Sequence, residues 1–252
     1  MFTMLMLDHG PRIEHVGVQS AIRKQEEDGI KKHFKTHMPF SFTPFNSRAK
    51  YIYIFRSPWD VCVSYFRQVI QMPQFYGATD VGFDEFFKDF IDGWTDCGSY
   101  FDHIVGWLAA ASKHPDNILI MRYEDLKRDA KAGILRLSSF LGGQYAASAN
   151  DSDIMDLVLK YTSFDYMKTL PCVMPASMRV ARTGRFNVGK EVDLVKPGDY
   201  MLVDFFKVGN ACYGQIFFTA DQKDQMNCLI REKFIHHPDL VKEWLLEEAH
   251  AV

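Results

Sequence analysis

The chain has 252 residues, 47% of them hydrophobic, and its 29 lysines and arginines against 32 aspartates and glutamates leave a net charge of −3. This composition is typical of a globular protein with a sizeable core, and it excludes disordered, collagen-like and disulfide-scaffold classes. The near-neutral balance offers no overall positive charge for nucleic acid or anionic membranes, so an anionic ligand must be bound by a local arrangement of residues.

The lengths of the apolar runs and the pattern of cysteines indicate the cellular compartment in which the protein is expected. The longest apolar runs, residues 1–7 and 105–111, are much shorter than the roughly 20 residues that span a bilayer. The first seven residues lack the basic flank and the small-residue cleavage site of a secretory signal. The 5 cysteines include no C-x-x-C pair, which indicates reduced thiols rather than disulfides or a metal site. We therefore expect a cytoplasmic protein without a metal centre or a membrane span.

The sequence reads as one continuous domain, because it has no repeat and no low-complexity tract over residues 1–252. Near the start, residues 18–28 are typical of a polar surface helix that Gly29 would end. Residues 32–37 predict a short extended segment, which Pro39 would close.

The best-marked element begins at residue 50. Residues 50–55 (KYIYIF) are β-branched or aromatic and mostly apolar on both faces, which predicts a strand buried in a parallel sheet. A helix to about residue 71 should follow at once. Ser57 suits the N-cap, Pro58 the first helical position and Asp60 the acid of a capping box.

The rest of the chain continues the alternation of strands and helices. Residues 117–121 (NILIM) predict a second buried strand, and residues 171–215 an irregular region rich in proline and glycine. Strands that alternate with helices predict an α/β sandwich, in which ligands bind at the carboxyl ends of the strands. A helix that includes Ile134, Leu137 and Leu141 should follow residues 122–125 and stop at Gly142. The further helices are expected over residues 84–92, 100–112, 152–160, 219–234 and 240–249, the one from residue 219 starting with a second capping box.

Arg56 stands at the carboxyl end of the first predicted strand, directly before the capped helix. A guanidinium beside the N-H groups and positive dipole of a helix N-terminus favours phosphate. Ser64, two turns into that helix, could add a hydroxyl donor on the same side. An ion pair between Arg56 and Asp60 at the sheet edge explains the spacing equally well.

Lys35 and His37 would project from one face of the extended segment, with Thr36 facing away. An imidazole is a natural base for removing a proton from an alcohol or phenol. A neighbouring ammonium could hold negative charge that develops on a leaving oxygen. The alternative is that both side chains simply lie on the surface.

Other candidates carry weaker signals. Tyr123 follows the second strand and could reach the same crevice as Arg56, or simply anchor the strand end. Phe164 could stack on a nucleobase, although core burial is the default for any of the 21 phenylalanines. Lys207 and Gly209 offer a cation and a flexible backbone within the irregular region, or a solvated loop. His236 and His237 lack a third ligand at metal-like spacing, and we assign them no role.

Taken in order, these segments resemble the cytosolic sulfotransferases, which transfer a sulfuryl group from 3'-phosphoadenosine 5'-phosphosulfate (PAPS) to an alcohol, phenol or amine. The resemblance covers about residues 12–235. It implies a sulfotransferase-like, P-loop-type parallel sheet flanked by helices. The matching segments are KTHMPF (35–40), YIYIFRSPWDVCVSYFR (51–67), FDEFF (83–87), YFDHIVGW (100–107), YEDLKRD (123–129) and TSFDYMK (162–168).

The resemblance also assigns roles. His37 matches the catalytic base, and Lys35 a lysine that contacts the leaving oxygen and the transferring group. Arg56 and Ser64 match the pair that binds the 3'-phosphate. The remaining nucleotide-binding positions are Tyr123, Thr162, Ser163, Phe164, Lys207 and Gly209, and no metal is implied.

The sequence departs from the family pattern in three places. Lys207-Val208-Gly209 stands where the family has Arg-Lys-Gly, which implies a weaker 3'-phosphate contact. Gln215 and Ala220 interrupt the dimer motif, so a homodimer by that route is in question. The first strand and the Pro-Lys-Ser-Gly-Thr-Thr-Trp loop that binds the 5'-phosphosulfate do not occur in the chain. We expect either an N-terminally truncated copy or another segment in the vacant place.

Two hypotheses follow. The first is a PAPS-dependent sulfotransferase acting on a small hydroxyl or amine acceptor, without nucleic-acid or membrane partners. The alternative is a catalytically inactive relative that binds nucleotide or protein partners, which the absent loop favours.

Overall fold

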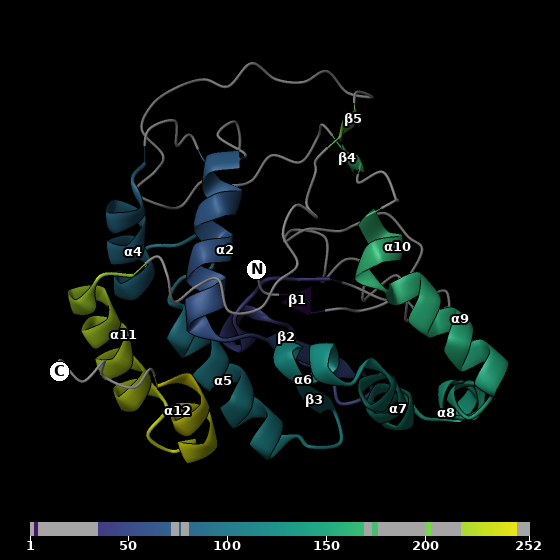
Figure 1. The fold of residues 1–252 in the computed structure, drawn as a ribbon. Helices are drawn as coiled ribbons and strands as arrows, with labels where there is room; N and C mark the ends of the chain where they lie inside the picture. Colours follow the sequence, from purple (N-terminus) through teal and green to yellow (C-terminus); the bar gives the residue numbers. More distant parts are fainter. Residues whose placement is uncertain are drawn as a thin grey trace, which may run out of the picture.

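The computed structural model describes residues 3–4, 35–71, 76, 81–168, 173–175, 200–202 and 218–245. A small sheet at the centre is surrounded by helices (Figure 1). The strands are β1 (Thr3–Met4), β2 (Tyr51–Phe55), β3 (Ile118–Arg122), β4 (Val173–Pro175) and β5 (Tyr200–Leu202). The helices are η1 (Phe40–Phe42), α2 (Pro58–Gln71), α4 (Phe83–Asp92), α5 (Tyr100–Lys113), α6 (Tyr123–Arg128), α7 (Ala130–Leu141), α8 (Gly143–Ala149), α9 (Ser152–Thr162), α10 (Phe164–Lys168), α11 (Ala220–Lys233) and α12 (Pro238–Trp244).

The two strands predicted from apolar runs are neighbours in the sheet. β2 and β3 pair in parallel, from Tyr51 opposite Ile118 to Phe55 opposite Arg122. Parallel pairing puts the carboxyl ends of both strands at one edge, where the chain continues into α2 and α6. This confirms the predicted α/β class with a parallel sheet flanked by helices.

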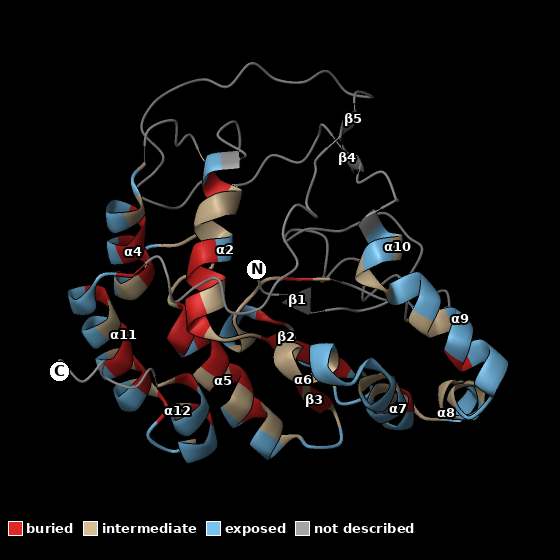
Figure 2. Cartoon of the chain, in the orientation of Figure 1, coloured by how far each residue is buried: buried red, intermediate tan, exposed pale blue. Residues whose placement is uncertain are grey.

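Helices cover both faces of the sheet, so alternate strand residues enter two cores. Tyr51, Tyr53 and Phe55 belong to a large aromatic cluster with α2, α4, α5, α11 and α12. On the opposite face Ile52 packs with β3 residues against α6 and α7 in a smaller cluster. Figure 2 shows burial concentrated in the sheet and α2, with α9 and α10 more exposed. Burial on both faces explains why β2 is nearly continuously apolar.

The second edge of β2 carries a short antiparallel strand. Thr3 of β1 lies opposite Ile54, and Met4 opposite Tyr53. An antiparallel partner was not predicted. β1 thus lies beside β2, on the edge away from β3.

Two further differences concern the predicted elements. The helix expected after residues 122–125 is α7, and the separate short helix α6 precedes it. The side chain of Asp129 accepts from Ala132 N-H and caps the start of α7. Within residues 171–215, expected to be irregular, β4 and β5 form an antiparallel pair. The helix expected over 18–28 lies outside the described residues. Among the described helices none is both long and apolar enough to cross a bilayer.

Candidate functional site

Arg56 follows β2 directly, and its side chain is largely covered, with 23% of it exposed. Its Nη2 donates to Asp60 Oδ2 at 2.9 Å, the ion pair that the sequence left as the alternative. The guanidinium carbon lies 4.7 Å from the centre of the Tyr123 ring, a cation–π contact. Nε of Arg56 is buried and has no hydrogen-bond partner among the described residues. The guanidinium is therefore held in place but retains donor capacity.

The start of α2 differs from the predicted capping box. Asp60 binds Arg56, and the N-H of Ser57 donates instead to Oε1 of Glu124, at 2.7 Å, from the adjoining α6. A carboxylate from a neighbouring strand end thus replaces the local acid at this N-terminus, where the helix dipole also favours negative charge.

The carboxylate of Glu124 is unusual because it is largely buried beside Arg56. Burial raises its pKa, while hydrogen bonds from backbone N-H groups and the charge of Arg56 oppose the rise. Oε2 of Glu124 is buried and unpaired among the described residues. The Tyr100 hydroxyl donates to the Arg56 carbonyl, and burial raises the pKa of Tyr100 far above its usual range, which keeps that hydroxyl protonated. The hydrogen bond from Ser57 N-H to Glu124 joins the two strand ends beside Arg56, and the Tyr100 hydroxyl joins α5 to the end of β2.

Ser64 lies on α2 with an exposed side chain. Tyr123 begins α6, half-buried, so the structure brings Tyr123 to Arg56 as predicted from the two strand ends. No described contact joins Ser64 to Arg56, and its expected role rests on the family resemblance.

Thr162, Ser163 and Phe164 form the junction between α9 and α10. The hydroxyl of Thr162 donates to the Val158 carbonyl, and that of Ser163 to the Lys160 carbonyl, each at 2.7 Å. The Ser163 hydroxyl also accepts from Tyr166 N-H at 3.2 Å, so it links α9 to α10. The ring of Phe164 faces Lys127 Nζ at 5.6 Å, which links this junction to α6.

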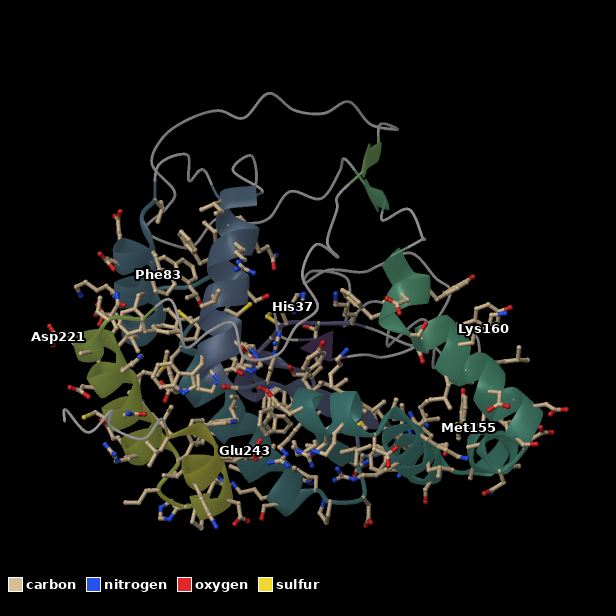
Figure 3. All side chains as sticks on the ribbon, viewed as in Figure 1. His37, Phe83, Met155, Lys160, Asp221 and Glu243 are labelled. Atoms are coloured by element: carbon tan, nitrogen blue, oxygen red, sulfur yellow. The ribbon has the colours of Figure 1, made fainter. Side chains whose placement is uncertain are left out.

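Lys35, Thr36 and His37 are non-helical, as predicted. Thr36 is buried and accepts from Met38 N-H at 3.1 Å, whereas Lys35 and His37 are half-buried. This alternation fits an extended segment with Thr36 turned inward. In the view of Figure 3, His37 is labelled near the middle of the molecule.

Lys207 and Gly209 lie outside the described residues. Over the described part of the chain, no group of three histidine, cysteine or acidic side chains is placed to hold a metal ion. Sequence reasoning missed Glu124, Lys127 and His103, although each stands inside a segment that carries the family resemblance. The partners of His103 are 50 and 66 residues away, and the partner of Glu124 is 67 residues away. Local sequence spacing therefore does not reveal these contacts.

The sulfotransferase domain family matches residues 5–211. The chain belongs to this family. A mouse relative, Sulfotransferase 2A2, is 36% identical over 173 residues, which is 66% of this chain and 55% of the relative. A rat relative, Sulfotransferase 2A6, is 30% identical over 243 residues, which is 94% of this chain and 75% of the relative. The chain thus spans little more than half the length of the mouse protein.

Solved structures agree on the fold. The crystal structure of mouse sulfotransferase SULT7A1 complexed with PAP matches with a TM-score of 0.64 at 23% identity, over 88% of this chain and 73% of that one. Retinol dehydratase in complex with retinol and PAP matches with a TM-score of 0.59 at 24% identity, over 81% and 54%. These likenesses confirm the predicted sulfotransferase fold.

Proposed function

We propose that the chain transfers a sulfuryl group from PAPS to a hydroxyl or amine of a small acceptor, with His37 as base and Lys35 beside the transferring group. Membership of the sulfotransferase family supports the reaction class. PAP in the related solved structures supports a 3'-phosphoadenosine nucleotide as ligand. A cytoplasmic location and the acceptor class are proposed on the same family basis.

The contacts of Arg56 are the main structural support for a nucleotide-binding site. A guanidinium fixed by Asp60 and by the Tyr123 ring, with a buried Nε still lacking a partner among the described residues, suits an anionic ligand. It stands directly before α2, a 14-residue helix whose exposed Ser64 could donate a second hydrogen bond. We assign the 3'-phosphate to Arg56 and Ser64.

The adenosine end is assigned to aromatic side chains on the other half of the site. Tyr123 is already stacked on Arg56, and Phe164 faces Lys127 of the same short helix. A planar base can stack on either ring, and each such contact contributes roughly 1–3 kcal/mol. Thr162 and Ser163 shape the backbone of this junction, and we propose that Lys207 and Gly209 complete the phosphate end.

The chemical step requires a proton to leave the acceptor. In the proposed mechanism, an imidazole nitrogen of His37 takes the proton from the acceptor hydroxyl as its oxygen bonds to sulfur. The bond between sulfur and the donor's phosphate oxygen breaks, and the Lys35 ammonium neutralises the charge that remains there. PAPS, when bound, supplies the activated sulfuryl group. Positioning and charge neutralisation would provide most of the rate enhancement, as in phosphoryl transfer.

A second candidate function needs only the nucleotide contacts proposed for Arg56 and Tyr123. The Pro-Lys-Ser-Gly-Thr-Thr-Trp loop that the family uses for the 5'-phosphosulfate does not occur in this chain. A catalytically inactive relative that binds nucleotide or protein partners would retain Arg56 and Tyr123 without needing that loop. Transfer activity, measured separately from nucleotide binding, distinguishes the two.

Calorimetric titration with PAP tests the nucleotide site. We expect binding, weakened by Arg56→Gln by roughly 10- to 100-fold because a hydrogen bond to a charged group is lost. Ser64→Ala should weaken binding by roughly 3- to 10-fold. The matched controls are Arg122→Gln and Ser139→Ala: Arg122 also ends a strand but is bound by Asp125 and Glu243, and Ser139 is an exposed serine on α7.

The controls should leave PAP affinity unchanged. No heat of binding in a folded wild-type sample would contradict both nucleotide functions. Equal losses of PAP affinity in Arg56→Gln and Arg122→Gln would show that arginines at strand ends affect PAP binding only through the stability of the fold.

A further inference from the structure

His103 of α5 lies between the strand β2 and the segment that carries His37. Its ring is buried, with 3% of the residue exposed. Nδ1 lies 2.8 Å from the Tyr53 hydroxyl, and Nε2 lies 3.1 Å from the backbone carbonyl oxygen of His37. The Tyr53 and His103 rings are also stacked, 5.5 Å between centroids. A core histidine thus bridges the sheet and the residue proposed as base.

These two contacts determine which nitrogen of His103 carries the proton. A carbonyl oxygen can only accept, so Nε2 must donate to His37 O. In a neutral ring Nδ1 then accepts, and the Tyr53 hydroxyl donates to it. Burial lowers the pKa of His103 to about 4 and raises that of Tyr53 well above its usual range, so neither group changes protonation near neutral pH.

A second side chain of α5, that of Trp107, donates a hydrogen bond to the backbone carbonyl of Met38, the residue after His37. Trp107, one turn after His103, donates from Nε1 to the Met38 carbonyl at 3.3 Å. Its ring stacks on Tyr53, 5.0 Å between centroids. Two consecutive carbonyls, those of His37 and Met38, are therefore held by residues one helical turn apart.

From this geometry we propose that His103 is a positioning residue for His37: as the neutral Nε2-H tautomer, fixed by Tyr53, it anchors the backbone of the proposed base. This inference rests on the proposed function for its consequence in catalysis. The anchoring itself does not depend on turnover. His103 touches no reacting atom in this scheme and acts only through His37.

The experiment combines two readouts on full-length variants. His103→Phe keeps a flat ring but removes the donor. His103→Gln restores an N-H in a position similar to Nε2. Tyr53→Phe removes the hydroxyl that selects the tautomer, and Tyr51→Phe is its matched control, because Tyr51 lies on the same strand and face but bonds to Pro44 and Asn46.

The first readout is amide hydrogen exchange over residues 35–42, measured by mass spectrometry, which needs no activity. His103→Phe should speed exchange there by about tenfold, the effect of losing one buried hydrogen bond. Tyr53→Phe should speed it by a smaller factor, and His103→Gln and Tyr51→Phe should leave it near wild type. If His103→Phe does not fold, Tyr53→Phe against Tyr51→Phe decides the question.

The second readout is transfer kinetics. His103→Phe should lower kcat by about tenfold with the KM for PAPS unchanged, and His103→Gln should recover most of the loss. Wild-type exchange and wild-type kcat in His103→Phe would overturn the inference. If the wild-type chain transfers nothing, the proposed function fails, while hydrogen exchange still decides whether His103 anchors His37.

Discussion

Arg56 and Arg122 stand at neighbouring strand ends but differ in how many of their hydrogen-bond donors are already bound within the protein. Arg122 is bound by Asp125 through Nε and Nη2, and by Glu243 through Nη1, and these partners raise its pKa. Arg56 has one acidic partner, Asp60, and a buried Nε with none among the described residues. Because a saturated guanidinium has little left to offer a ligand, Arg56 is the candidate anion-binding group and Arg122 the structural one.

The buried carboxylate of Glu124 predicts a dependence of stability on pH. Its pKa is raised in the folded state, chiefly by burial, so the folded chain binds this proton more tightly than the unfolded chain. Stability should therefore fall as pH rises above about 4.3, the ordinary glutamate pKa, until the folded group ionises. Glu124→Gln keeps an acceptor for Ser57 N-H and should raise the urea midpoint at pH 7, with the gain vanishing near pH 4.

Asp125 provides a control of opposite sign. Hydrogen bonds from Arg122 lower the pKa of Asp125, so its contribution to stability is present above the ordinary aspartate pKa and is lost as pH falls through the lowered value. Asp125→Asn should lower the urea midpoint at pH 7 and have less effect in acid. Equal effects of Glu124→Gln at both pH values would contradict the account of Glu124.

Among the elements, those with local signals were predictable and those with distant partners were not. The capping box of α11 is present as expected, with Thr219 and Gln222 bonding reciprocally. The box expected at Ser57 is replaced by Glu124, 67 residues away. In α11 the partners stand three residues apart, whereas the partner of Ser57 depends on the pairing of two strands, which sequence spacing does not reveal.

Asp129, which separates α6 from α7, is predicted to stabilise the fold as the N-cap of α7. Asp129 accepts from Ala132 N-H at 2.9 Å, and α7 covers the smaller core cluster. Asp129→Ala should lower the free energy of unfolding by about 1 kcal/mol, the usual contribution of an N-cap. The control is Asp153→Ala, an exposed acid in the first turn of α9 that is not its cap. Urea denaturation giving equal losses for both would refute the assignment of Asp129 as a cap.

Over the whole molecule, the two apolar runs predicted the parallel strand pair because a strand buried on both faces has a nearly continuous apolar sequence. Tyr53 and Ile52 indeed enter different cores. The antiparallel strand β1 and the role of His103 were not predictable, since both depend on contacts across the fold. Of the ten predicted site residues, Arg56 and Tyr123 are in contact, and Lys207 and Gly209 lie outside the described residues.

The most direct test of the central proposal is transfer of radiolabelled sulfate from PAPS to a panel of phenols and alcohols. We expect the wild-type chain to label at least one acceptor. His37→Ala should lower turnover by at least about a hundredfold, the usual contribution of a general base, while PAP affinity is retained. Wild-type chain that binds PAP but transfers nothing, or unchanged turnover in His37→Ala, would contradict the proposed mechanism.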